Sequence, residues 1–177
     1  ENVYKLVDEM LDGIRLQRRK MDVNVNMRKQ NLVPILMSIF AIYLPISIHK
    51  RVDLNYEFSA EDIEAIIDAD LFKIVIRNLL NNALKFTDAK GEVKITVAQI
   101  GENVELCVVD NGRGMDQNTL QRLRDGLSNS ESEESAHQDG IGLGLVLCRK
   151  AMLSMNSSME IDSSPEKGTR IKMVFSA

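Results

Sequence analysis

The chain has 177 residues, of which 44% are hydrophobic and 27% are charged, and it carries a formal net charge of −4 at neutral pH. This composition is typical of a soluble globular protein with one domain, or one domain and an appendage, and the negative charge without a dense basic stripe excludes nucleic acid as an expected partner. The two cysteines, Cys107 and Cys148, lie far apart without metal-ligand spacing, so neither a disulfide framework nor a zinc site is predicted, and a reducing cytosol fits.

The first predicted element is a helix over residues 1–20. Its apolar side chains recur at spacings of four, three and four residues, at Val3, Val7, Met10 and Ile14. This heptad-like stripe indicates either the end of a longer helix that packs on a partner or an ordinary amphipathic helix. Because the sequence begins without an initiator methionine or a signal-like segment, we expect the chain to be part of a larger protein.

An uncharged segment over residues 32–48 challenges the soluble interpretation, because its 17 residues reach the lower bound for a membrane span. A short strand is predicted before it, where apolar residues alternate with asparagine over residues 23–27. For residues 32–48 we favour a core helix that begins at an Asn31 cap and breaks near Pro45. The chain is therefore expected not to insert into a membrane.

The remaining elements mix strands and helices. In chain order they are a half-buried strand over 52–58, a helix capped by Asp68 or Asp70, a hairpin of strands 92–100 and 104–109 around Gly101-Glu102-Asn103, a polar loop over 128–139, a helix over 141–155, and two final strands around 159–161 and 171–175. The last four strands are neighbours in sequence, which favours antiparallel pairing. The pattern predicts an α+β sandwich with helices on one face of the sheet.

The helix after Asp70 carries polar residues in an unusual place. In LFKIVIRNLLNNALKFT, residues 71–87, steps of 100° put Asn78, Asn82 and Lys85 within about 60° of one another. Because the rest of the helix is largely apolar, the two amides are expected where a core normally excludes them. Either they are structural and bond to neighbouring backbone, or they face a ligand, since an amide oxygen suits Mg²⁺ and a lysine suits phosphate.

A strand-like run ends in VVDNGRGM, residues 108–115. One interpretation is a strand that closes into a tight turn, because Asn-Gly supplies the positive φ angles that such turns need. The other is that Gly112 and Gly114 let the backbone approach a ligand while the strand points Asp110 into a pocket. This stretch alone leaves both interpretations open.

Two more glycine motifs lie nearer the C-terminus. GIGLGL, residues 140–145, precedes the apolar helix but lacks the Rossmann spacing, and the chain contains no Walker A motif. Glycines at a helix N-terminus form either a flexible hinge or a phosphate site, because unpaired backbone N–H groups favour an anion. Lys167-Gly168-Thr169, taken alone, is merely a turn.

Four motifs thus follow one another along the chain: NLLNNALKFT from Asn78, DNGRG from Asp110, GIGLGL from Gly140, and Gly168-Thr169. In order and spacing they resemble the N, G1, G2 and G3 boxes of the sensor histidine kinase ATP-binding domain. That domain belongs to the GHKL superfamily, which it shares with gyrase, heat-shock chaperones and mismatch-repair ATPases. The resemblance implies the Bergerat fold, an α/β sandwich with a mixed, mostly antiparallel sheet and helices packed on one face.

The resemblance also implies the domain organisation and the ligands. Residues 21–177 would form the catalytic ATP-binding domain with a lid at about 115–139, and residues 1–20 are similar to the end of the dimerisation and phosphoacceptor helix. In this family the domain binds Mg-ATP and transfers the γ-phosphoryl group to a histidine on the dimerisation domain of the same protein. The polar lid is expected to be poorly ordered without nucleotide.

Individual roles follow from the same resemblance. Asp110 matches the carboxylate that accepts a hydrogen bond from the adenine amino group, which guanine lacks at that position. Asn82 matches the asparagine that binds Mg²⁺, Asn78 and Lys85 complete the catalytic set near the phosphates, and Thr169 lies near adenine through water. The other implied ATP-binding residues are Gly112, Gly114, Met115, Gly140, Gly142, Leu143, Gly144 and Leu145.

The chain departs from the family pattern between the G1 and G2 boxes. The aromatic F box is missing, and Leu120, Leu123 and Leu127 stand in a region without phenylalanine. This absence favours an alternative function, a degenerate or nucleotide-sensing module without kinase activity. A gyrase-type ATPase clamp is disfavoured, because Asn78 stands four residues before Asn82, where that branch has a glutamate general base.

Further partners follow from the resemblance. His49 and His137 are the only histidines, and neither lies in a helix like the phosphoacceptor motif, so the acceptor is expected elsewhere in the parent protein. The parent is expected to be a homodimer with a response regulator downstream. This chain is expected to be cytoplasmic, as the cytosolic part of a membrane-anchored receptor.

Overall fold

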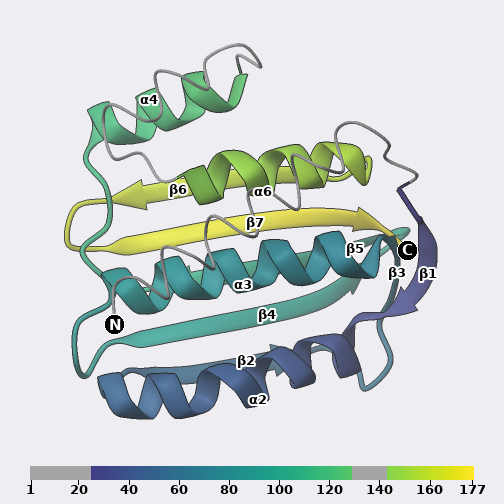
Figure 1. The fold of residues 1–177 in the computed structure, drawn as a ribbon, viewed down its shortest axis with the longest axis horizontal. Coiled ribbons are helices and arrows are strands. Elements are labelled where there is room, and N and C mark those ends of the chain that lie inside the picture. Colours follow the sequence, from purple (N-terminus) through teal and green to yellow (C-terminus); the bar gives the residue numbers. More distant parts are fainter. Residues whose placement is uncertain (1–24, 129–142) are drawn as a thin grey trace.

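The computed structural model describes residues 25–128 and 143–177, which form a sheet covered by helices (Figure 1). The predicted helix over residues 1–20 lies outside the described residues, as do residues 129–139 of the predicted polar loop. The described helices are α2 (Leu32–Lys50), α3 (Ala69–Phe86), α4 (Gln117–Ser128) and α6 (Leu143–Ser154).

The main sheet has five strands in the order β2-β4-β5-β7-β6. Their bounds are β2 (Asp53–Phe58), β4 (Glu92–Ile100), β5 (Asn103–Asp110), β6 (Ser158–Ser164) and β7 (Gly168–Ser176). Strand β2 pairs with β4 in parallel, and every other pairing in this sheet is antiparallel. The predicted hairpin is confirmed, with Ile100 opposite Asn103 and Gly101 at a φ of 62°.

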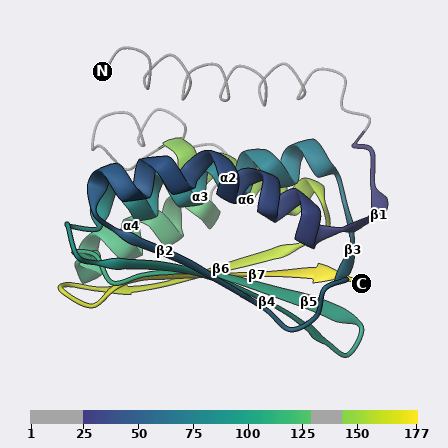
Figure 2. The same ribbon diagram turned by 90° about the horizontal axis from the view of Figure 1, so that it is seen from below.

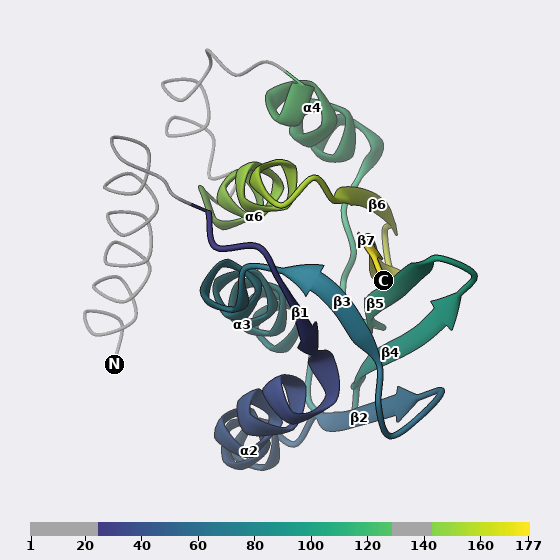
Figure 3. The same ribbon diagram turned by 90° about the vertical axis from the view of Figure 1, so that its right-hand side faces the viewer.

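All the described helices lie on one face of this sheet, and none of them covers the other face (Figure 2). Seen from the end, they lie side by side in the order α2, α3, α6, α4 (Figure 3). The α+β sandwich with helices on one face is therefore confirmed.

The strand predicted over residues 23–27 is wrong for residues 25–27, the part of it that the structure describes, because none of these three residues is in a strand. A two-stranded antiparallel sheet instead pairs β1 (Arg28–Asn31) with β3 (Glu64–Ile67). Among the described residues, Asn26 donates its backbone N–H to the Asp68 carboxylate at 3.0 Å, so this N–H is used by a side chain outside any ladder. Among the described residues, strand pairing in this segment begins at Arg28.

Helix α2 begins as predicted, because the Asn31 side chain accepts the backbone N–H of Val33 at 3.0 Å. The predicted break near Pro45 is wrong: the helix continues to Lys50 and ends where Arg51 adopts a left-handed conformation with a φ of 57°. Pro45 and Ala41, whose carbonyl would normally receive the N–H at position 45, are both exposed. Water can bind the unpaired carbonyl there, which lowers the cost of the missing donor.

One face of α2 packs on the rest of the domain. The Tyr43 hydroxyl donates to the Arg77 carbonyl of α3 at 3.2 Å, and the Phe40 ring contacts the Tyr56 ring of β2 at a centroid distance of 4.9 Å. The opposite face exposes large apolar side chains, including Ile42 (53% exposed) and Ile48 (68% exposed). By length and composition α2 is apolar enough to cross a membrane, but 33% of its most apolar window is buried inside the protein.

We predict that the chain stays in solution without detergent and remains in the dense fraction when it is floated with liposomes. Insertion of α2 would remove Leu36, Ile39 and Tyr43 from the core, and each such side chain contributes about 1.5–3 kcal/mol by its burial. Persistent movement of the chain to the liposome fraction would contradict this prediction. Liposomes that carry a known transmembrane peptide provide the positive control.

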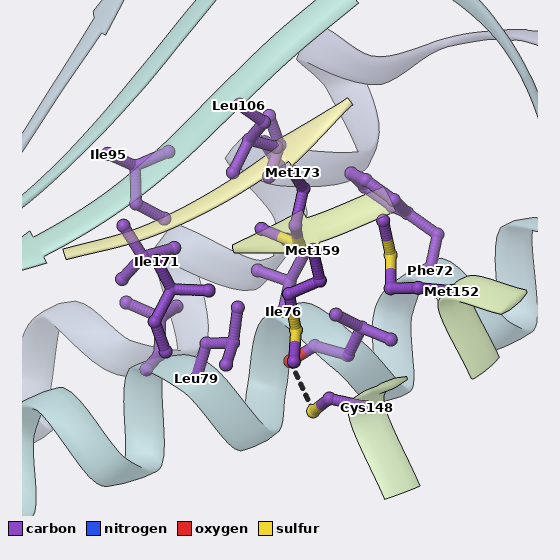
Figure 4. Close-up of a cluster of buried hydrophobic side chains, with 14 of the residues drawn as sticks. Phe72, Ile76, Leu79, Ile95, Leu106, Cys148, Met152, Met159, Ile171 and Met173 are labelled. Carbon is purple, nitrogen blue, oxygen red and sulfur yellow. Dashed lines mark hydrogen bonds between the residues drawn. The ribbon is translucent and has the colours of Figure 1, made fainter. Parts of the chain in front are cut away.

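The core lies between the sheet and the helices (Figure 4). Phe72 and Ile76 of α3 and Ile95 and Leu106 of the sheet are all below 2% exposed, and the Phe72 ring contacts the Phe175 ring of β7 at a centroid distance of 5.6 Å. Cys148 of α6 is also in this core, and its thiol donates to the Val75 carbonyl with a sulfur-to-oxygen distance of 3.8 Å, drawn as the dashed line in Figure 4. Burial raises the pKa of Cys148 to about 12, so it remains a neutral thiol that acts as a core residue.

Candidate functional site

Helix α3 carries the three polar residues predicted for the N box. The Asp68 carboxylate caps the helix by accepting the backbone N–H groups of Asp70 and Leu71 at 3.0 and 3.1 Å, which decides between the two predicted caps. Asn78 and Asn82 are half-buried, so the expectation that they sit inside the core is wrong. The fully buried stripe of α3 is apolar, and the asparagines lie at its margin, where a ligand or water can reach them.

Asn78 lies against the start of α6. Its side-chain NH₂ donates to the Ile74 carbonyl at 3.3 Å, within its own helix. On the other side, a Cβ placed on Gly144 would come within 2.6 Å of the Asn78 side-chain oxygen. A residue larger than glycine would therefore push against this amide, and the close approach brings the predicted N and G2 boxes together.

Asp110 ends β5 with its side chain turned toward the helices. It is 8% exposed and pairs with Val93 on one side and Thr169 on the other. Its carboxylate accepts the Gly112 N–H at 3.0 Å. Burial raises the pKa of Asp110, while backbone N–H groups of Gly112 and Thr169 oppose this shift by binding the charged form. The result is a buried carboxylate held by the backbone at two points.

The loop that follows Asp110 is tied to three other elements. Asn111 exchanges two hydrogen bonds with the backbone of Glu92 at the start of β4, at 2.7 and 3.2 Å. Arg113 donates its N–H to the Phe86 carbonyl at the end of α3, at 3.1 Å. Its own carbonyl accepts the N–H of Glu166, in the turn between β6 and β7, at 2.9 Å. These bonds join the predicted N, G1 and G3 boxes.

Two glycines are required at this junction. Gly114 has a φ of 64°, and a Cβ on it would lie 1.9 Å from the Ser164 carbonyl oxygen. Gly168 has a φ of 83°, and its Cβ would lie 1.9 Å from the Asp110 carbonyl oxygen. Only glycine allows such contacts. The structure thus gives these glycines a role in packing one backbone segment on another, whatever else they contact.

The segment predicted as a lid is partly helical. Within the lid predicted over residues 115–139, residues 117–128 form α4, and residues 129–139 lie outside the described residues. Asp116 begins this helix by accepting the backbone N–H and the hydroxyl of Thr119 at 2.9 and 2.8 Å. Leu120 and Leu123, which stand in place of the F box, are buried in the core. Their spacing of three residues after a capping aspartate was the signal that would have revealed the helix.

The remaining predicted residues differ in what the structure describes. Leu145 is buried on α6, Met115 is half-buried, and Thr169 is half-buried at the start of β7. Lys85 is exposed, with its Nζ 5.1 Å from the Phe86 ring centroid, and the Arg113 guanidinium lies over the same ring at 4.5 Å. Outside the described residues are Gly140, Gly142 and the side chain of Leu143.

Contacts therefore link the predicted boxes in one region. Phe86 binds the loop after Asp110, Asp110 pairs with Thr169, and Asn78 touches Gly144. Asn82 lies one helical turn from both Asn78 and Phe86. Sequence reasoning missed Arg113 and Ser163, which join these segments through contacts between residues distant in sequence.

The sequence and the fold both match known proteins. Residues 67–177 match the family described as histidine kinase-, DNA gyrase B-, and HSP90-like ATPase. The adaptive-response sensory kinase SasA of Synechocystis is 25% identical over 169 residues, which cover 94% of this chain and 44% of that protein. The sensor histidine kinase RcsC of Escherichia coli is 29% identical over 170 residues, which cover 95% of this chain and 18% of that protein.

Solved structures share the fold. The catalytic domain of histidine kinase ThkA aligns with this chain at a TM-score of 0.71 and 20% identity. The aligned part covers 85% of this chain and 95% of the ThkA chain. Full-length ShkA, solved in complex with AMPPNP, aligns at a TM-score of 0.76 and 20% identity. The aligned part covers 99% of this chain and 36% of the ShkA chain. The chain spans less than half the length of the two curated relatives named above.

Proposed function

Because this chain belongs to the histidine kinase-, DNA gyrase B-, and HSP90-like ATPase family, we propose that it is the catalytic ATP-binding domain of a two-component sensor histidine kinase. The observation that carries the proposal is Asp110, a buried carboxylate at a strand end, bonded by the backbone and linked to α3 and β7. An ionised carboxylate only accepts hydrogen bonds, so it favours the amino group of adenine over the carbonyl oxygen of guanine.

The phosphates of ATP are assigned to the opposite end of the site. Asn78 and Asn82 offer half-buried amides, and Lys85 offers a cation one helical turn further along α3. Gly140, Gly142, Leu143, Gly144 and Leu145 belong to the segment that enters α6, where backbone N–H groups favour an anion. The contact between Asn78 and Gly144 supports a single phosphate site built from both segments.

Mg²⁺ fits this donor set only together with the nucleotide. Among residues 25–128 and 143–177, no three histidine, cysteine, aspartate or glutamate side chains gather to hold an ion. Mg²⁺ keeps several waters and binds phosphate oxygens, so the single amide oxygen of Asn82 suits an ion that arrives with ATP. When bound, the ion supplies neutralisation of the phosphate charge.

The reaction that follows is transfer of the γ-phosphoryl group to a neutral imidazole. The imidazole lone pair forms the new P–N bond, the bond to the β,γ-bridging oxygen breaks, ADP leaves, and the imidazole proton passes to solvent. The residues of this chain hold ATP in line with the acceptor. The acceptor histidine is assigned to the dimerisation domain of the parent protein, since the sequence around His49 and around His137 does not resemble the phosphoacceptor motif.

The parent protein is proposed to be a homodimer that works in the cytosol beneath a membrane receptor and passes the phosphoryl group to a response regulator. Histidine kinase ThkA has been solved in complex with the response regulator TrrA, and its chain has a TM-score of 0.76 at 17% identity to this one. This likeness supports such a partner for the parent.

The proposed function is tested with radiolabelled ATP and Mg²⁺, with and without an added dimerisation domain of the parent protein. We expect acid-labile label on the added domain and none on this chain alone. The Asn82→Ala variant should abolish the transfer, whereas Asn55→Ala, in β2 and outside the site, should leave it unchanged. Acid-stable label on this chain, or nucleotide binding without any transfer, would contradict the kinase and favour the nucleotide-sensing alternative.

A further inference from the structure

Ser163 makes three hydrogen bonds at the junction between the G1 and G3 segments. In β6 its hydroxyl accepts the backbone N–H of Met115 at 2.9 Å and donates to the Gly168 carbonyl at 2.9 Å. A third bond of 3.0 Å joins it to the Thr169 hydroxyl. A serine hydroxyl has one proton to donate and two lone pairs to accept with, so these three bonds use its full capacity within the protein.

The partners of Ser163 stand on both sides of Asp110. Met115 ends the loop that begins at Asp110 and leads into α4. Thr169 lies opposite Asp110 in the ladder, and its backbone N–H binds the Asp110 carboxylate. Gly168 packs on the Asp110 backbone so closely that it admits no Cβ. Ser163 therefore connects the two segments that frame this carboxylate.

We propose that Ser163 is a positioning residue for recognition of the nucleotide base. It holds the Thr169 hydroxyl and the Met115 backbone in the places where they complete the pocket around Asp110, and it acts through them, since its own hydroxyl has no bonding capacity left for a ligand. The proposal rests on the proposed function, in which Asp110 and Thr169 bind the adenine end of ATP.

The test measures the Kd of Mg-ADP and of Mg-IDP for the full chain. Inosine carries a carbonyl oxygen where adenine has its amino group, so the ratio of the two Kd values reports recognition at Asp110. In Ser163→Ala, the Met115 N–H and the Gly168 carbonyl lose their partner. We expect the Kd of ADP to rise about tenfold, with a smaller rise for IDP, because leaving such groups unpaired loosens the base pocket.

Two further variants make the test specific. Ser163→Thr keeps the hydroxyl and should restore most of the ADP preference. Ser158→Ala removes an exposed hydroxyl from the same strand and should leave both Kd values unchanged. Should Ser163→Ala fold poorly, Ser163→Cys keeps the side-chain volume but offers only weak hydrogen bonds, and it should lose the preference as well.

The outcomes separate this proposal from the function on which it rests. If the wild type prefers ADP and Asp110→Asn abolishes that preference, but Ser163→Ala binds both nucleotides as the wild type does, the positioning role is overturned and the function stands. An equal loss for ADP and IDP also overturns it, since that result means a general loss of stability. If the wild type binds neither nucleotide, both proposals fall.

Discussion

Replacement of Asp110 by asparagine is expected to raise the Kd for ADP about 100-fold, the scale of a lost hydrogen bond to a charged, buried group. The carboxylate accepts the Gly112 and Thr169 backbone N–H groups, and the proposed ligand adds the adenine amino group as a third donor. An asparagine keeps one accepting oxygen and replaces the other by an NH₂ donor. The new NH₂ group then faces either the adenine amino group or a backbone N–H, and two donors cannot form a hydrogen bond.

The matched control is Asp116→Asn, because Asp116 is an exposed carboxylate only six residues further along the chain. It caps α4, and asparagine caps helices about as well as aspartate does, so ADP binding should not change. Titration with a fluorescent ADP analogue measures both variants. Wild-type affinity in Asp110→Asn would refute the assignment of the G1 box.

Asp110 also gives nucleotide binding a defined pH dependence. Burial raises the pKa of Asp110, and the ligand needs the ionised form. Affinity should therefore be full above this raised pKa and fall as the pH decreases through it, at a higher pH than for an ordinary aspartate. The Asp110→Asn variant has no such group and should show no change in that pH range.

The rate of ATP hydrolysis by the chain alone is expected to be about 10²–10⁴-fold lower than that of a related enzyme with a general base. In the gyrase branch of the family, a glutamate at the position of Asn78 activates water. An amide has no useful basicity near neutral pH, and the NH₂ of Asn78 is already bonded to the Ile74 carbonyl. Water near the γ-phosphate is thus oriented at best, whereas a histidine brings its own lone pair.

Release of labelled phosphate from ATP measures this rate. The Asp110→Asn variant, purified in the same way and assayed at an ATP concentration well below its raised Kd, sets the background from contaminating ATPases. The rate above this background should stay far below the rate of transfer to an added dimerisation domain. Rapid release that disappears in Asp110→Asn would show a dedicated ATPase and would refute the kinase interpretation.

Local patterns in the sequence determined most of the elements. Asn31 caps α2 as predicted, and Asp68, one of the two predicted caps, caps α3, since a cap depends on residues two or three positions away. The hairpin of β4 and β5 follows from alternation around Gly101 for the same reason. The candidate site residues were also proposed from the sequence, because each box is a contiguous motif, and their roles in nucleotide binding stay predictions.

Only the tertiary structure decided where distant segments meet. Pro45 is a helix breaker by propensity, yet α2 continues because the carbonyl it leaves unpaired faces solvent. Val25 and Met27 alternate like a strand, but the Asn26 N–H binds Asp68, which is 42 residues away in sequence. Ser163 is one polar residue in a strand until its bonds to Met115 and Thr169 are seen. Such contacts depend on how separate elements pack, and no local propensity encodes them.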